Sequence, residues 1–145
     1  MVLELVLVVH AGATCFMVGL IWLVQVVHYP LMDRVEGEGF AAFERDHQKL
    51  IGPIVAPVML VEGVTAAALV WLLAGGGWSW VIACVGLGLV VVNGVSTALV
   101  QVPLHARLSR GFDARAHVAL VSTNWVRTLA WSLRSVLALW LLVLV

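Results

Sequence analysis

The sequence predicts an all-α integral membrane protein: one domain over residues 1–145, folded as a four-helix bundle with both termini on the outer side of the membrane. Hydrophobic residues fill 63% of the 145 positions and charged residues 11%, against roughly half and roughly a quarter in a soluble domain. The mean hydropathy is +1.08. Four spans of about 20–25 residues with short loops would use nearly the whole length. We therefore expect the lipid bilayer to be the main solvent of this chain and its first partner.

The first span is predicted at about residues 2–29, where a long apolar run meets Pro30. Proline lacks the backbone N–H and biases the preceding residue away from helix, so the first helix is expected to end there. A charged loop follows, which must reach water. Its second half, at about residues 40–50, spaces apolar residues three and four positions apart, and this spacing predicts an amphipathic helix.

The second span, at about residues 51–73, continues directly from the amphipathic helix. Pro53 and Pro57 predict a bend near its start. The glycine-rich turn at residues 74–77 ends this span and predicts a tight hairpin. The third span follows at about residues 80–104, and it begins among tryptophans of the kind that favour a membrane interface.

The fourth span is predicted at about residues 115–144, after Gly111–Asp113, which supplies a break and a helix N-cap. Basic residues set the orientation, because they fall in the first and third loops and within the last span: Arg34, Arg45, Lys49, Arg107, Arg110, Arg115, Arg127 and Arg134. By the positive-inside rule the first and third loops face the cytoplasm and both termini lie outside. We expect a multi-pass protein of a cell membrane, the inner membrane of a bacterium.

Polar residues inside the spans are informative because lipid offers them no partner. The fourth span is the richest, with five residues on one helical stripe: His117, Asn124, Arg127, Trp131 and Arg134. Two arginines on one buried face need a counter-charge. The stripe is therefore the first candidate for a functional surface.

Glu62 is the one acid in the middle of a span, and Arg127 lies at a similar depth. Together with Asn93 and Asn124 they predict one buried polar network. One interpretation of this network is a structural ion pair supported by amides. Arg134 is then left without an acid, and this favours binding of an anionic small molecule, such as a porphyrin propionate, a carboxylate or a lipid phosphate.

Four histidines fall near the predicted cytoplasmic ends of the four spans: His28, His47, His105 and His117. Imidazoles that converge from facing helices are typical ligands of haem and of transition metals in bundles, so these four form the candidate metal site. His10 lies in the other half of the first span and is a candidate axial ligand of haem. Glu44 and His47 also have the Glu-x-x-His spacing of a di-iron site, once rather than twice. The candidate cofactor-binding residues are His10, His28, His105, His117, Arg127 and Arg134.

The order of these residues resembles that of the HemJ-type protoporphyrinogen oxidases, small four-helix proteins of bacterial membranes. The similar features are His10, Gly19–Leu23, Val27–Pro30, Phe43–His47 leading to Pro53, and the arginine-rich stretch Arg107–Asn124. The resemblance covers most of the chain as a pattern and implies the four-helix architecture. That family has an essential lysine near the start of its third helix, where this chain has Trp80–Cys84. The resemblance therefore supports the architecture and the candidate residues, and it does not carry over the oxidase activity.

The chain is also similar, and more closely, to an uncharacterised group of small four-helix bacterial membrane proteins. Three segments carry this likeness: Val27–Pro30, Gln101–His105 and Thr123–Thr128. They contain His28, His105 and Arg127, which are already candidates on physical grounds. This likeness supports the same architecture and names no reaction.

Three functions are compatible with these patterns. The leading hypothesis is a membrane protein that binds haem, a porphyrin or a transition metal between its helices, with a membrane oxidoreductase as the enzyme class. The alternative is a non-enzymatic membrane subunit or interaction protein with a structural polar core. The third is transport of a small solute, which so short a chain would need a homo-oligomer to perform. A nucleic-acid partner is not expected, because the formal net charge is zero.

Overall fold

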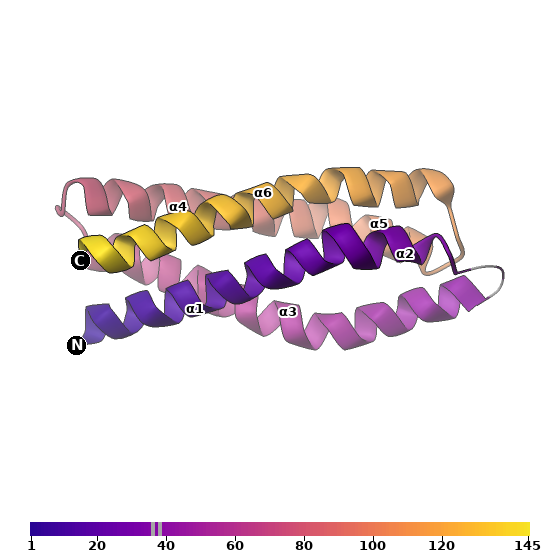
Figure 1. The fold of residues 1–145 in the computed structure, drawn as a ribbon, viewed down its shortest axis with the longest axis horizontal. Helices are drawn as coiled ribbons and strands as arrows, with labels where there is room; N and C mark the ends of the chain where they lie inside the picture. Colours follow the sequence, from indigo (N-terminus) through magenta and orange to yellow (C-terminus); the bar gives the residue numbers. More distant parts are fainter. Residues whose placement is uncertain (36, 38) are drawn as a thin grey trace.

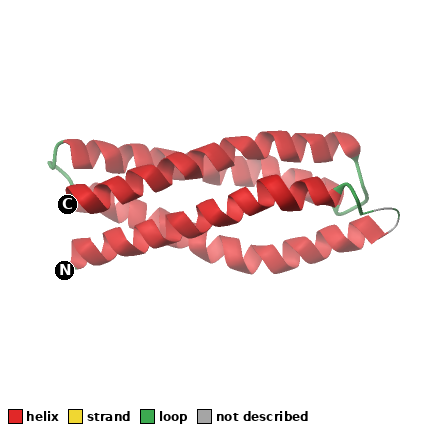
Figure 2. Cartoon of the chain, in the orientation of Figure 1, coloured by secondary structure: helices red, strands yellow, loops and turns green. Residues whose placement is uncertain are grey.

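The computed structural model describes residues 1–35, 37 and 39–145, and among these every regular element is a helix. Glu36 and Glu38 of the first charged loop lie outside the described residues. The elements are, in chain order, α1 (Val2–Leu23), the π-helical segment η1 (Val24–His28), α2 (Tyr29–Met32), α3 (Gly39–Leu72), α4 (Trp78–Ser96), the π-helical segment η2 (Thr97–Gln101), α5 (Val102–Leu108) and α6 (Ala114–Leu144). Figure 2 shows these helices joined by short loops.

Four continuous helical stretches are long and apolar enough to cross a membrane: Val2–Met32, Gly39–Leu72, Trp78–Leu108 and Ala114–Leu144. A stretch of 31 residues is about 46 Å long at the α-helical rise, which exceeds the roughly 30 Å of bilayer hydrocarbon. The all-helical class and the four potential spans that the sequence predicts are therefore confirmed.

The four stretches run alternately up and down the bundle, and α1 and α4 each pack against both α3 and α6. The helices α3 and α6 therefore face each other across the bundle axis. Both chain termini and the glycine-rich hairpin lie at one end of the molecule, here called the terminal end (Figure 1). The other two loops lie at the opposite end, here called the loop end.

Two π-helical segments explain why the first and third stretches pass through a proline. The segment η1 precedes Pro30, and η2 precedes Pro103. A π-bulge rearranges the backbone hydrogen bonds of one turn, and at this point a residue without an N–H is tolerated. The first helix consequently continues to Met32, three residues beyond its expected end at Tyr29.

The predicted amphipathic helix and second span form one continuous helix, α3, with Pro53 and Pro57 inside it. Figure 1 shows α3 curving along the middle of its length, as expected where prolines interrupt the backbone hydrogen bonds. The start of α6 is capped as the sequence predicts, because the Asp113 side chain accepts a hydrogen bond from the Ala116 N–H at 3.0 Å. This cap fixes the start of α6.

Apolar core clusters occupy both ends and the middle of the bundle. Between them lies an unusual number of buried polar side chains, and α6 contributes the most: His117, Asn124, Arg127, Thr128 and Arg134. Trp131 of the same stripe is fully buried as well. The stripe of α6 therefore faces the bundle interior, whereas large apolar side chains cover the outer surface.

Candidate functional site

The half of the bundle nearer the terminal end holds a closed ion pair across the bundle axis. Arg134 of α6 donates to the Glu62 carboxylate of α3 at 2.6 Å. The Trp131 indole N–H also donates to this carboxylate, at 3.0 and 3.2 Å. Both charged side chains are almost fully buried, at 1% exposure each. From their similar depths, the sequence predicts that Glu62 lies near Arg127. In the structure the Glu62 carboxylate instead contacts Arg134, which lies about two helical turns further along α6.

Three further side chains complete this cluster. Arg134 also reaches the Thr14 hydroxyl at 3.5 Å, and the His10 Nδ1 lies 2.8 Å from the Thr65 hydroxyl. The Thr65 hydroxyl in turn donates to the Val61 carbonyl at 2.7 Å, so His10 must be the donor to Thr65. We call this set the terminal-side network: His10, Thr14, Glu62, Thr65, Trp131 and Arg134. Its charges balance within the cluster.

The two π-helical segments each aim a buried glutamine at α6. Gln25 donates to the Val121 carbonyl at 3.2 Å and accepts from the Asn124 amide at 2.8 Å. Gln101 donates to the Thr123 hydroxyl at 3.0 Å. These contacts fix the middle of α6 against both η1 and η2. π-Helical segments occur frequently at functional sites, and here both contact the middle of α6.

Of the two buried arginines of α6, Arg127 is the one that has no acidic partner among the described residues. Its guanidinium donates to the Asn124 side-chain oxygen at 3.0 Å and lies 5.1 Å from the centroid of the Trp131 ring. Among the described residues no carboxylate lies within ion-pair distance of Arg127, and its buried Nε has no hydrogen-bond partner. A positive charge at 6% exposure with neutral neighbours is costly, and an anion would offset that cost.

A chain of three side chains lies on the loop-end side of Arg127. The His105 Nδ1 is 2.6 Å from the Glu44 carboxylate, and the His105 Nε2 is 3.1 Å from the Tyr29 hydroxyl. A carboxylate accepts, so Nδ1 carries the hydrogen, and in the neutral ring Nε2 accepts a hydrogen bond that the Tyr29 hydroxyl donates. Gln48 steadies this arrangement by donating to Glu44 at 3.0 Å and to the His105 carbonyl at 3.2 Å.

The remaining histidines have different surroundings. His28 stacks on His47 with ring centroids 4.3 Å apart, and His47 lies 5.5 Å from His105. His117 is held elsewhere, because its Nε2 donates to the Tyr29 carbonyl at 2.9 Å, at the start of α2. Three of the four candidate metal ligands therefore share one layer. Within the described part of the chain no group of three or more His, Cys, Asp or Glu side chains is arranged to hold a metal ion.

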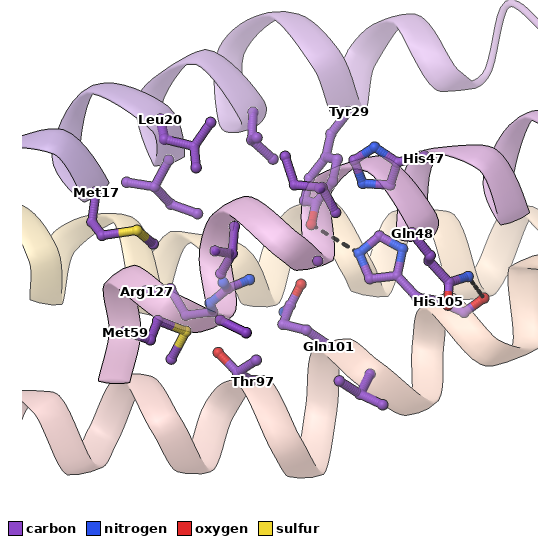
Figure 3. A pocket seen from close by; sticks show the side chains of 17 residues that line it. Met17, Leu20, Tyr29, His47, Gln48, Met59, Thr97, Gln101, His105 and Arg127 are labelled. Carbon is purple, nitrogen blue, oxygen red and sulfur yellow. Dashed lines mark hydrogen bonds between the residues drawn. The ribbon is translucent and has the colours of Figure 1, made fainter. Parts of the chain in front are cut away.

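Arg127 and the His105 chain border one cavity of about 310 Å³ between the helices, at the lower end of the roughly 300–1,000 Å³ of ligand pockets. Figure 3 shows Arg127 between Met17 and Met59, with Tyr29, Gln48 and His105 gathered at the other side of the cavity. Apolar side chains form most of the wall. Its polar lining comes from Tyr29, His47, Gln48, Thr97, Gln101, His105 and Arg127. We call these seven residues, together with Glu44, the loop-side site.

The predicted buried network is thus divided between two clusters. Glu62 belongs to the terminal-side network, whereas Asn124 and Arg127 belong to the middle of the bundle. Asn93 is buried in α4, but its amide has no hydrogen-bond partner among the described residues. The reason is geometric: equal depth in two helices does not bring two side chains to the same side of the bundle.

Sequence reasoning did not single out three contributors to the site: Glu44 as a buried acid, Tyr29 and Gln101. Glu44 stands in a run of charges, which suggested a solvated face, yet it is completely buried. A usable signal was the tripeptide Val-Gln-Val, which occurs at residues 24–26 and again at 100–102, each time shortly before a histidine. The repeat marks the two π-helical segments.

No known protein family, curated protein or solved structure matches this chain. Its chemistry is therefore inferred from the geometry of its own residues. Three features of the loop-side site matter for this: a buried cation without an acid, an apolar cavity beside it, and a tyrosine hydroxyl linked to a buried carboxylate.

Proposed function

We propose that this chain is a multi-pass protein of a cell membrane, the inner membrane of a bacterium, with both termini outside and the two charged loops in the cytoplasm. The surface of the bundle supports this, because large apolar side chains are exposed along all four stretches. Exposed tryptophans gather near the terminal end, as at a membrane interface: Trp71, Trp78, Trp80 and Trp140. The basic loop residues lie at the opposite end.

We propose further that the protein binds a small, mainly apolar molecule with an anionic or hydrogen-bond-accepting group in the cavity of the loop-side site. The observation that carries this proposal is Arg127, a buried guanidinium that lines the cavity and has no acidic partner among the described residues. The apolar wall suits a ligand that arrives through lipid, and the guanidinium suits its polar group.

Equilibrium binding to the protein purified in mild detergent tests this proposal. Octanoate is a suitable anionic probe, and its methyl ester is the uncharged match. We expect octanoate to bind the wild-type protein and Arg127→Gln to weaken that binding at least about tenfold, since a hydrogen bond to a charged group contributes about 1.5–3 kcal/mol. Arg115→Gln, at an exposed position of the same helix, is the matched control. Equal binding of octanoate to both variants would refute a role for Arg127.

A haem or porphyrin is the second candidate ligand, and one observation favours it. His47 lines the cavity and its ring takes part in none of the hydrogen bonds of the described residues, so its imidazole would be the iron ligand and Arg127 would hold a propionate. Bound haem would supply redox chemistry. The described residues do not fit a centre with four histidine ligands, because His117 is held by the Tyr29 carbonyl.

A visible spectrum and elemental analysis of the purified protein, before and after addition of haem, test this candidate. A Soret band that His47→Gln removes and His117→Gln retains would support it. If neither haem nor the octanoate probe binds, the polar core is structural, and the chain is then better described as a non-enzymatic membrane subunit.

A further inference from the structure

Two opposite charges meet at the loop-side site without forming an ion pair. Arg127 has neutral partners, and Glu44 has a histidine and a glutamine as its partners among the described residues. The second carboxylate oxygen of Glu44 is buried without a hydrogen-bond partner. A direct ion pair, like that between Glu62 and Arg134, would have neutralised both charges. Instead, among the described residues, Arg127 has no carboxylate partner and Glu44 has no arginine or lysine partner.

The chain from Glu44 through His105 to Tyr29 connects one of these charges to the cavity. Glu44 is completely buried and Tyr29 is 2% exposed, so bulk water does not stand between the three groups. Both donor–acceptor distances, 2.6 and 3.1 Å, permit a proton to move along the chain. Tyr29 and His105 both line the cavity. A carboxylate that orients a histidine and stabilises its protonated form is the logic of a catalytic triad.

We propose that the loop-side site ionises a weakly acidic, membrane-soluble ligand: Tyr29, His105 and Glu44 take the ligand's proton, and Arg127 holds the resulting anion. This deepens the proposed function and rests on it. The ligand class is a lipophilic phenol, carboxylic acid or similar hydroxyl acid. Such a molecule crosses lipid in its neutral form, which explains how it reaches a cavity inside the bundle.

Two hydrogens move along the chain from the ligand to His105. The ligand O–H bond breaks and a new O–H bond forms on the Tyr29 oxygen, while the original Tyr29 hydrogen moves to the His105 Nε2. The electron pair stays on the ligand oxygen, which becomes an anion beside Arg127. His105 becomes an imidazolium with hydrogens on both nitrogens, held by the Glu44 carboxylate. Ionisation of one neutral ligand thus gives two ion pairs, Arg127 with the ligand anion and Glu44 with His105, and the net charge of the site does not change.

Other titratable groups surround His105 and must be included in any test. His47 of α3 lies 5.5 Å from its ring, and His28 of η1 stacks on His47. Arg127 of α6 lines the same cavity. His47 is the competing base, because it lines the cavity too. In a second competing mechanism, Arg127 alone stabilises the ligand anion and the ligand's proton passes to the buffer.

The probe 4-nitrophenol distinguishes these mechanisms, because its phenolate is yellow and its neutral form is not; 4-nitroanisole is the match without an acidic proton. Binding is measured about one unit below the probe's own pKa in the same detergent, where roughly a tenth of free probe is ionised. We expect the bound probe to be mainly phenolate, with no proton released to a weakly buffered solution containing a pH indicator. In Tyr29→Phe and His105→Gln the phenolate-to-phenol ratio should fall about tenfold.

Ser122→Ala, which removes an exposed hydroxyl of α6 outside the cavity wall, is the control that should keep the wild-type ratio. Binding of 4-nitroanisole shows that each variant retains the cavity. An unchanged ratio in Tyr29→Phe and His105→Gln, a loss in His47→Gln alone, or release of one proton per bound phenolate would each overturn the proton transfer while leaving ligand binding intact. Failure of both probes to bind the wild-type protein would overturn the proposed function as well.

Discussion

The two polar clusters use the same kinds of residue in opposite ways. Each combines a glutamate of α3 with an arginine of α6: Glu62 with Arg134 in the terminal-side network, and Glu44 with Arg127 in the loop-side site. The first pair is in direct contact at 2.6 Å and is supported by Trp131. In the second, a histidine, a tyrosine and a cavity lie between the charges.

The partners of a buried charge decide whether its role is structural or chemical. The terminal-side network is complete without any ligand, so its residues are expected to contribute to stability. Among the described residues, the loop-side site leaves the Arg127 guanidinium without an acidic partner and one Glu44 carboxylate oxygen without a hydrogen bond, and such incomplete neutralisation is typical of functional sites. Substitutions of Glu62 and Arg127 test this division, and substitutions of Gln25, Gln101 and Asp113 test the contacts that hold α6 in place.

The largest expected effect is a loss of stability in Glu62→Gln. Removing one partner of a buried ion pair leaves the other charge uncompensated, which costs about 3–5 kcal/mol. Unfolding by sodium dodecyl sulfate in mixed micelles, followed by circular dichroism, measures the change. The double variant Glu62→Leu/Arg134→Met removes both charges and should recover most of the loss. A Glu62→Gln protein as stable as the wild type would contradict the structural role.

The next effect concerns Arg127→Met, which should lose affinity for an anionic ligand by about 1.5–3 kcal/mol. Its stability should stay near that of the wild type, because the substitution removes a buried charge that has no acidic partner. The same unfolding experiment and octanoate binding give the two numbers. If Arg127→Met unfolds as readily as Glu62→Gln, the division between the clusters is wrong.

An intermediate effect is expected for Gln25→Leu. Gln25 makes hydrogen bonds to Val121 and Asn124, and its loss leaves the buried Asn124 amide unsatisfied, at a cost of about 1–3 kcal/mol. Gln101→Leu is the matched variant in the other π-helical segment. Its single bond to Thr123 predicts a smaller loss, and the order of the two unfolding midpoints checks the assignment.

The smallest effect lies at the loop end, outside the apolar part of the bundle. The Ala116 N–H, and then Arg107, stabilise the Asp113 carboxylate and hold its pKa below the ordinary value of 3.8. The stabilisation is complete above that value and is lost as the pH falls through the lower pKa of the folded state. Acid unfolding of Asp113→Asn should therefore show a weaker pH dependence below pH 4 or so than that of the wild type. Identical profiles would contradict this.

The composition and the periodicity of the chain were sufficient to predict four long helices, because a bilayer-spanning segment needs only a local property, an apolar run of sufficient length. The Asp113 cap is equally local. The end of the first helix was misplaced at Tyr29, since η1 lets the helix continue through Pro30 to Met32. A π-bulge depends on the packing of its neighbours, and proline alone does not reveal it.

The choice of candidate residues was determined largely by the sequence, because a polar side chain within an apolar span is conspicuous wherever it occurs. Arg127, Arg134, Glu62, His105 and the α6 stripe all emerged in this way. Their partners were decided by the tertiary structure alone. Glu62 pairs with Arg134 rather than with Arg127. Glu44, which stands in a charged run of the sequence, is fully buried beside His105. The sequence determines how deep a residue lies along its helix. The rotation of each helix about its axis, and the helix that a side chain faces, are fixed only when the four helices pack together.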